Sequence, residues 1–296
     1  MSNGPPRIFD RHALALHRAR ARRIGGDAFL EQEAAEGLAE RLSSVRRTFS
    51  NALELEPRVS SAATFHPLAK HWTQAPLQDD ESFANGHEEF ELIVSVLSLH
   101  AVNDLPGVLV QARRALKPDG LFMAALFGGE TLFELRDALA ASEIETKGGI
   151  SPRVAPFADV RDLGGLLQRA GFSLPVADVE RTVVRYRDFT TLIADLRAMG
   201  ETNALTERNR GPISRPTLAA AMAYYAAHHA DADGRLRATF DIVYLTGWAP
   251  HESQQKPLKP GSASSRLAEA LKTTEHSAGE QAPNVRDTPP ETGRRR

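Results

Sequence analysis

Apolar positions in the middle of the chain follow the pattern of alternating strands and helices. Residues 90–99 form a nearly continuous apolar run rich in β-branched residues, which is typical of a strand buried on both faces of a parallel sheet. Residues 104–120 then show an apolar face at helical spacing and a Lys-Pro-Asp-Gly stop, and residues 121–127 form another apolar run. This order predicts a parallel βαβ unit.

Helical and strand patterns continue on both sides of that unit. Amphipathic spacing predicts helices over 10–24, 27–46, 128–143, 158–172, 189–200 and 215–230, and strands over 176–186 and 237–248. We therefore divide the chain into a helical N-terminal segment (1–48), an α/β domain (49–252) and a tail (253–296). The domain carries a helical insertion, about 189–232, between its last two strands. The tail is polar and rich in Pro, Ser and Gly, a composition that favours disorder.

The segment before the βαβ unit is the least regular. Residues 51–57 predict a short strand closed by Pro57, whereas 58–89 are poorly patterned, and we expect a loop with one short helix there. No strand that ends in an acidic residue is predicted between 58 and 78.

Composition excludes several classes of protein and site. The formal net charge is −2, so there is no global electrostatic case for nucleic-acid binding. The chain has no cysteine, which excludes disulfides, thiolate metal sites and a cysteine nucleophile. His228 and His229 are adjacent helix positions that face different ways, so we predict no metal site.

The same sequence shows no sign of a membrane-spanning or secreted protein. No apolar run approaches the roughly 18–20 residues that cross a bilayer, and the N-terminus lacks the apolar core of a secretory signal. The basic stretch 11–23 could suggest a mitochondrial presequence, but a solvated basic helix is the interpretation we favour. We expect a cytoplasmic bacterial protein that reaches the inner membrane only through a partner.

Five segments resemble a known family. They are "IFDR" (8–11), 94–139, 148–172, "DLRAMGETNA" (195–204) and "TGWAPHESQQKP" (246–257). They look like the arginine-hydroxylase assembly factors of mitochondrial complex I and their bacterial relatives, which are similar to the malonyl-carrier-protein methyltransferase of biotin synthesis. The resemblance implies an α/β class I methyltransferase fold (Rossmann-like), S-adenosyl-L-methionine (SAM) as cofactor, and a protein partner such as an iron–sulfur subunit of complex I.

Residues 51–65 depart from the family pattern. The family's first strand ends in an acidic residue and a glycine-rich turn, because the backbone must pass close to the cofactor. Here no glycine lies between Gly37 and Gly86, and Pro57 and Arg58 stand where glycines are expected. The distance to the next strand also indicates that one early strand–helix unit is missing or remodelled.

The site residues follow from the rule that ligands bind beyond the carboxyl ends of the strands. His100 is the candidate general base, with a packed loop histidine as the alternative. Expected cofactor contacts are Glu54, Ser98, Leu99, Phe127 and Gly128, although Glu54 could be solvated and the glycine pair could form a plain strand–helix turn. Expected substrate or partner contacts are Gly129, Glu130, Glu201, Asn203, His251 and Glu252.

Three functions remain open at this point. The first is a SAM-dependent enzyme that modifies a partner arginine, as the resemblance implies. The second is an inactive binding or assembly factor that has lost SAM, which the eroded loop favours. The third is a carboxyl methyltransferase whose acidic carrier protein would dock on Arg208, Arg210 and Arg215. The acceptor and the oligomeric state are not determined by the sequence.

Overall fold

The computed structural model describes residues 7–25, 28–58, 62–83, 86–255 and 272. The chain divides into two units, Met1–Glu252 and Ser253–Arg296. The predicted polar tail lies, apart from 253–255 and 272, outside the described residues. The fold below is therefore that of the first unit.

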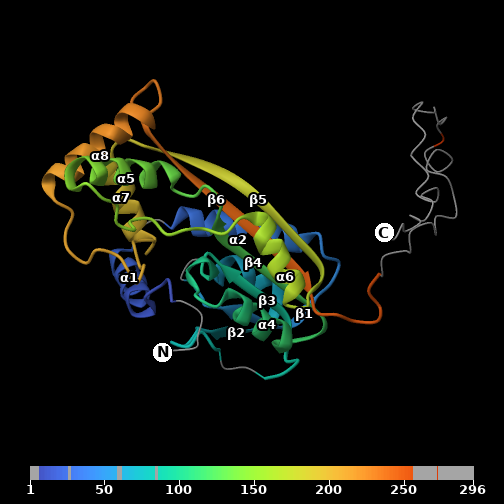
Figure 1. The fold of residues 1–296 in the computed structure, drawn as a ribbon. Helices are drawn as coiled ribbons and strands as arrows, with labels where there is room; N and C mark the ends of the chain where they lie inside the picture. The colour runs from blue at the N-terminus through green and yellow to red at the C-terminus, as the bar shows by residue number, and fades with distance from the viewer. Residues whose placement is uncertain (1–6, 26–27, 59–61, 84–85, 256–271, 273–296) are drawn as a thin grey trace, which may run out of the picture. The chain divides into compact units, whose positions relative to one another are not determined.

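A six-stranded sheet forms the centre of this unit (Figure 1). Its strands are β1 (Phe49–Leu55), β2 (Ala69–Ala75), β3 (Phe90–Val96), β4 (Leu116–Gly128), β5 (Ser173–Tyr186) and β6 (Leu236–Trp248). They lie in the order β2-β1-β3-β4-β6-β5. The first four are parallel, and β6 is antiparallel to both β4 and β5. Chain connections leave β1 and β3 in opposite directions, so the sheet has a topological switch point between these two strands.

Helices cover both faces of the sheet. On one face, α4 (Leu105–Ala115) and α6 (Val160–Arg169) bury their apolar sides against alternate residues of β1, β3, β4 and β6. On the other face lie α2 (Phe29–Ser43), α5 (Phe133–Lys147), α7 (Phe189–Ala198) and α8 (Arg215–His228). Figure 1 shows α5, α7 and α8 gathered at one end of the long strands β5 and β6, and α1 (Arg11–Ile24) packs against α7.

Short polar residues fix where several of these helices begin. A side-chain oxygen accepts a backbone N–H in the first turn at five N-caps, which are Asp10, Asp104, Asp159, Asp188 and Ser214. Such a cap satisfies a donor that has no partner inside the helix and contributes about 1 kcal/mol.

The predicted fold class is confirmed, including the N-terminal helices and the helical insertion between β5 and β6. The prediction for 58–89 was wrong in one respect, because β2 lies there and pairs in parallel with β1 from Phe49↔Ala69 to Leu55↔Ala75. Between these strands the described helical structure is short, namely α3 (Ala62–Phe65) and a 3₁₀ turn (His66–Leu68). The early unit is thus remodelled.

β2 was not predicted from the sequence because it is the outer strand of the sheet. Of its seven residues, only Ala75 is buried, and the others are half-buried or exposed. An edge strand with little buried surface carries neither an apolar run nor a clear alternation, which are the signals on which strand prediction depends.

Candidate functional site

The chain leaves β1 and β3 through left-handed backbone at residues that are not glycine. Glu56 follows β1 with φ 51°, and Leu97 follows β3 with φ 41°. Such a conformation costs roughly 1–2 kcal/mol per residue for an L-amino acid with a Cβ atom. The left-handed turn that a glycine would adopt is therefore present after β1, but Glu56, one residue before Pro57, adopts it.

The guanidinium group of Arg58 closes the space at the carboxyl ends of β1 and β3. Its side chain is 7% exposed. Nε donates to Glu31 Oε2 at 3.2 Å, and Nη1 donates to Leu97 O at 3.2 Å and to Glu201 Oε1 at 2.9 Å. Nη2 donates to Met199 O at 2.7 Å. One side chain thus joins α2, the end of β3 and the segment after α7 across the switch point.

Glu201 links Arg58 to His100. Its Oε2 lies 3.0 Å from His100 Nε2. Burial alone would raise the pKa of Glu201, but the charges of His100 and Arg58 lower it to about 2. Burial alone would likewise lower the pKa of Arg58, and Glu201 and Glu31 raise it instead. Both groups are therefore held in their charged forms.

A second group of charges lies beside the first. Glu56 accepts from Arg18, lies 3.7 Å from Arg11 Nη2, and accepts the backbone N–H of Leu77 at 2.6 Å. Arg18 also donates to Ser98 O at 3.4 Å. Burial and the nearby charge of Arg58 lower the pKa of Arg18. This second group ties α1 to the ends of β1 and β3.

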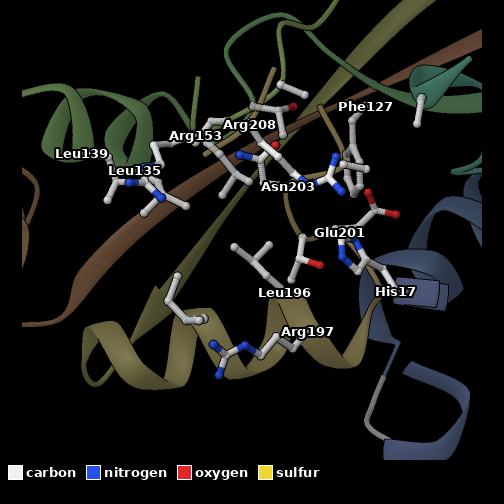
Figure 2. A pocket seen from close by; sticks show the side chains of 18 of the residues that line it. His17, Phe127, Leu135, Leu139, Arg153, Leu196, Arg197, Glu201, Asn203 and Arg208 are labelled. Atoms are coloured by element: carbon white, nitrogen blue, oxygen red, sulfur yellow. The ribbon is translucent and has the colours of Figure 1, made fainter. Parts of the chain in front are cut away.

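A cavity of about 730 Å³ opens next to these ion pairs. Its walls are largely apolar, with Phe127, Leu132, Leu135, Phe157, Leu196 and Phe240 among them. Figure 2 shows Leu135 and Leu139 at one end of this cavity and Glu201 and His17 at the other. The basic residues of its lining are His17, Arg20, His100, Arg153, Arg197, Arg208 and Arg210, whereas Glu201 is the one acidic residue among the described lining residues.

His100 borders both the ion pairs and the cavity. Its side chain is 4% exposed, and its ring lies 5.0 Å from that of Phe127 and 6.1 Å from that of Phe157. Within the described part of the chain, its buried Nδ1 atom has no hydrogen-bond partner. A buried imidazole nitrogen without a partner, next to a cavity, is placed to contact a bound group.

The family of the chain follows from comparison with known proteins. A family described as methyltransferase domain matches residues 13–175. The chain belongs to this methyltransferase family. It is 37% identical over 265 residues to "Arginine-hydroxylase NDUFAF5, mitochondrial" from Danio rerio, covering 82% of each chain. The Dictyostelium discoideum protein of the same name is 47% identical over 188 residues, which span 63% of this chain but 43% of that protein.

Two further similarities agree with this family. The chain is 32% identical over 282 residues to "Malonyl-[acyl-carrier protein] O-methyltransferase" from Halorhodospira halophila, covering 86% of this chain and 94% of that protein. The crystal structure of YcgJ from Bacillus subtilis superposes with a TM-score of 0.50 at 9% identity, over 73% of this chain and 99% of that one. The YcgJ match supports the fold alone. The family resemblance drawn from the sequence segments is confirmed.

Of the predicted site residues of this methyltransferase-family chain, four meet at the cavity. They are His100, Phe127, Glu201 and Asn203. Asn203 is held by bonds from its Nδ2 to Pro152 O at 2.8 Å and from Leu205 N to its Oδ1 at 3.0 Å. The structure therefore brings together segments that lie about a hundred residues apart in the sequence.

Three further residues predicted as cofactor contacts, Glu54, Ser98 and Leu99, are buried near the carboxyl ends of β1 and β3, where they contact other protein groups. Glu54 is 3% exposed and accepts from Gln74 Nε2 at 2.8 Å. The Ser98 hydroxyl lies 2.9 Å from Glu56 O and 3.0 Å from Val96 O, and Leu99 packs into the apolar core around α4. None of these three residues belongs to the cavity lining.

The glycine pair after β4 has packing and turn roles. A Cβ atom on Gly128 would lie 2.5 Å from Val243 Cγ2, and Gly129 adopts φ 49°. Glu130 is exposed outside the cavity lining, and its backbone N–H donates to Asp241 Oδ2 at 2.9 Å.

His251 and Glu252 lie near the amino ends of the parallel strands. They follow β6, whose last residue, Trp248, pairs with Leu121 at the start of the apolar part of β4. Both residues are exposed. The structure thus places them away from the carboxyl ends of the parallel strands, where we expected partner contacts.

Glu31, Glu56 and Arg18 are members of the site that were not predicted from the sequence, and Arg58 was interpreted as a defect of the loop. One signal was available for Glu31, because this glutamate lies on the buried face of α2 four residues before Ala35. A charge on an apolar face needs a partner of opposite charge. In the described residues, no group of three His, Cys, Asp or Glu side chains is arranged to hold a metal ion.

Proposed function

We propose that the protein is a partner-binding member of its family, which contributes to the assembly of respiratory complex I and does not transfer a methyl group. The observation that supports this proposal is that Arg58 closes the space at the carboxyl ends of β1 and β3. The guanidinium group of Arg58 lies between the ends of β1 and β3, ion-paired to Glu31 and Glu201. This is the inactive-factor alternative that the missing glycine loop favours.

The residues at this edge do not fit SAM in the position that the fold implies. In sheets of this class the ligand lies beyond the carboxyl ends of the strands at the switch point. Here Pro57 has no backbone N–H to offer, Glu56 takes the glycine-like turn, and Arg58 uses the carbonyl of Leu97. We therefore derive no step through SAM.

The cavity is the part of the molecule that we assign to the partner. Its volume and apolar wall suit an inserted peptide segment, and Arg20, Arg197 and Arg210 are exposed lining residues. Exposed basic side chains attract an acidic partner surface and make association dependent on ionic strength. The name of the Danio rerio relative, an arginine hydroxylase, supports a partner that presents an arginine. An iron–sulfur subunit of complex I is the partner that we propose.

A second candidate function is modification of that partner's arginine. The observation that favours it is His100 Nδ1, a buried nitrogen at the cavity that has no partner in the described part of the chain. The carrier-protein alternative has weaker support, because Arg208 is already paired with Asp10 at 3.0 Å and Arg215 does not line the cavity.

We propose that the protein acts at the bacterial inner membrane. Among the described residues, no helix has the length and hydropathy needed to cross a bilayer. We propose a location on the cytoplasmic side of the bacterial inner membrane, where the complex I subunit holds the protein.

Affinity capture with the quinone-proximal iron–sulfur subunit from the same organism tests this function. We expect saturable binding that weakens with salt and is unchanged by SAM or its demethylated product. The double variant Arg20→Ala/Arg197→Ala should weaken capture at least several-fold. The matched control Arg187→Ala/Arg235→Ala removes two exposed arginines outside the cavity lining and should not. Absence of capture, or capture that requires SAM, would refute the proposal.

A further inference from the structure

We propose that two copies of the chain associate through the outer edge of β5, as an antiparallel pair of strands with Thr182 on the two-fold axis. Strand β5 is the last strand in the sheet order, so among the described residues it pairs with β6 alone. Figure 1 shows it along the border of the sheet. None of its residues lines the cavity, and the inference does not rest on the proposed function.

The outer edge of β5 is long and apolar. The outward N–H and C=O groups of an edge strand are available to another strand. Strand β5 has 14 residues, whereas β2 at the opposite edge has 7. Ten large apolar side chains are exposed in the described part of the chain, and four of these lie on β5, namely Leu174, Val176, Val179 and Val183, each 46–55% exposed. An apolar edge strand of this length favours pairing with a further strand.

Charged side chains protect many edge strands, but those of β5 already have partners within the chain. The four ion pairs, with N···O distances of 2.6–2.8 Å, are Asp178–Arg41, Glu180–Arg41, Arg181–Asp241 and Arg185–Asp231. Asp241 belongs to β6, so the guanidinium group of Arg181 is directed towards the inner neighbour of β5 and away from its outer edge. A second strand therefore meets no uncompensated charge on β5.

Symmetry and charge together select one register. A two-fold axis between two copies of one edge strand makes them antiparallel and places residues of the same face opposite each other. Between positions 178 and 185, every axis position except Thr182 places like charges directly opposite, as an axis at Val183 does for Arg181 and Arg185. Like charges at opposite positions destabilise a pair of strands.

The Thr182 register also brings suitable side chains together on one face. Val183 then lies opposite Arg181 of the second copy, and Val179 lies opposite Arg185 of the second copy. The aliphatic part of an arginine side chain packs on an apolar neighbour while its charged end remains with its own partner. The two Thr182 residues lie opposite each other on the other face.

The helices beside β5 leave room for the second copy. On one face α6 covers only the first part of the strand, where a Cβ atom on Gly164 would lie 3.4 Å from Ala177 Cβ. In the Thr182 register the two Ala177 residues are about 33 Å apart along the strands, at about 3.3 Å per residue, so the two α6 helices do not meet. On the other face, α2 bonds to β5 through the side chains of Glu33 and Arg41.

Sedimentation of the full chain from about 1 to 100 μM tests the association, and we expect a dimer with a micromolar Kd. Val179→Lys/Val183→Lys should weaken it at least about ten-fold, because each lysine lies opposite an arginine. Val179→Glu/Val183→Glu should keep or tighten it, since each glutamate meets an arginine. The matched control Ile144→Lys/Ile150→Lys changes two exposed residues outside β5 and should leave the dimer unchanged. Circular dichroism and urea unfolding check that each variant is folded.

Distances between spin labels test the register. The chain has no cysteine, so one introduced cysteine labels one position in each copy. Labels at Val183, Val179 and Val176 should lie on backbone positions about 8, 20 and 40 Å apart across the dimer. Distances that do not increase in this order would overturn the register.

A chain that stays monomeric at about 100 μM, or a dimer that the lysine pair does not weaken, would overturn the inference. Equal weakening by the lysine and glutamate pairs would do the same. If the lysine pair abolishes capture of the iron–sulfur subunit, that subunit occupies the edge and the inference is wrong. A monomeric lysine variant that still captures the subunit supports it, and dimerisation without any capture refutes the proposed function alone.

Discussion

Substitution of Arg58 by alanine should destabilise the protein far more than loss of an ordinary arginine. Arg58 is 7% exposed and compensates two buried carboxylates, Glu31 and Glu201. Removing one partner of a buried ion pair leaves an uncompensated charge, which typically costs 3–5 kcal/mol. An exposed arginine contributes within about 0.5 kcal/mol.

The size of the loss can be followed through its pH dependence. At neutral pH we expect the free energy of unfolding to fall by about 3–5 kcal/mol, which corresponds to a decrease in Tm of roughly 10 °C. Without the charge of Arg58, the pKa of Glu201 rises from its lowered value, although His100 still lowers it, and protonation of this carboxyl relieves part of the penalty. The difference between Arg58→Ala and wild type should therefore shrink as the pH falls through the range in which Glu201 is protonated in the variant but not in wild type.

Urea unfolding monitored by circular dichroism and tryptophan fluorescence provides the measurement. Arg58→Lys should lose about half as much stability, since it keeps the charge but not the fork. Arg20→Ala, an exposed helix position, is the control and should change the free energy of unfolding by less than about 0.5 kcal/mol. A loss below about 1 kcal/mol for Arg58→Ala, or one that does not depend on pH, would show that Arg58 is not a buried counter-ion.

Three further predictions concern Glu201 and two positions elsewhere in the fold. Because the pKa of Glu201 is lowered from 4.5 to about 2, its ionised form contributes roughly 3 kcal/mol above pH 4.5, which is lost as the pH falls towards 2. Acid unfolding of Glu201→Gln should thus show a shallower slope in this window than wild type, and an equal slope would contradict the assignment. Gly128→Ala should cost about 1–3 kcal/mol in urea, because its Cβ would lie 2.5 Å from Val243 Cγ2, whereas Gly165→Ala, which meets nothing within 4 Å, should not destabilise. Tyr225→Phe should lose about 1 kcal/mol, since the Tyr225 hydroxyl donates to Arg237 O at 2.7 Å, and a neutral result would show that this bond adds nothing.

Most of the fold could be predicted from the sequence, because long elements with a buried face repeat their apolar residues. β3, α4 and the apolar part of β4 follow directly from the apolar pattern of 90–127, and the insertion helices follow from two amphipathic stretches. The predicted stop at 117–120 was wrong, because β4 already begins at Leu116. β2 could not be predicted in this way, since its exposed residues carry no pattern. Its existence depends on pairing with β1, which is a long-range property of the backbone.

The site was predictable only in outline. The rule that ligands bind at the carboxyl ends of parallel strands identified His100 and Phe127, and family resemblance added Glu201 and Asn203. The role of Arg58 was not predictable, because its partners are contributed by α2, β3 and the segment after α7. A sequence shows that a glycine has been replaced, but not what the new side chain binds.

Calorimetric titration of the wild-type protein with SAM tests the central claim most directly. If Arg58 and its carboxylate partners close the edge between β1 and β3, SAM should give no saturable heat up to millimolar concentration, and neither should its demethylated product. Binding of SAM with a micromolar Kd would contradict the account and would indicate that the protein is a methyl-transferring member of its family.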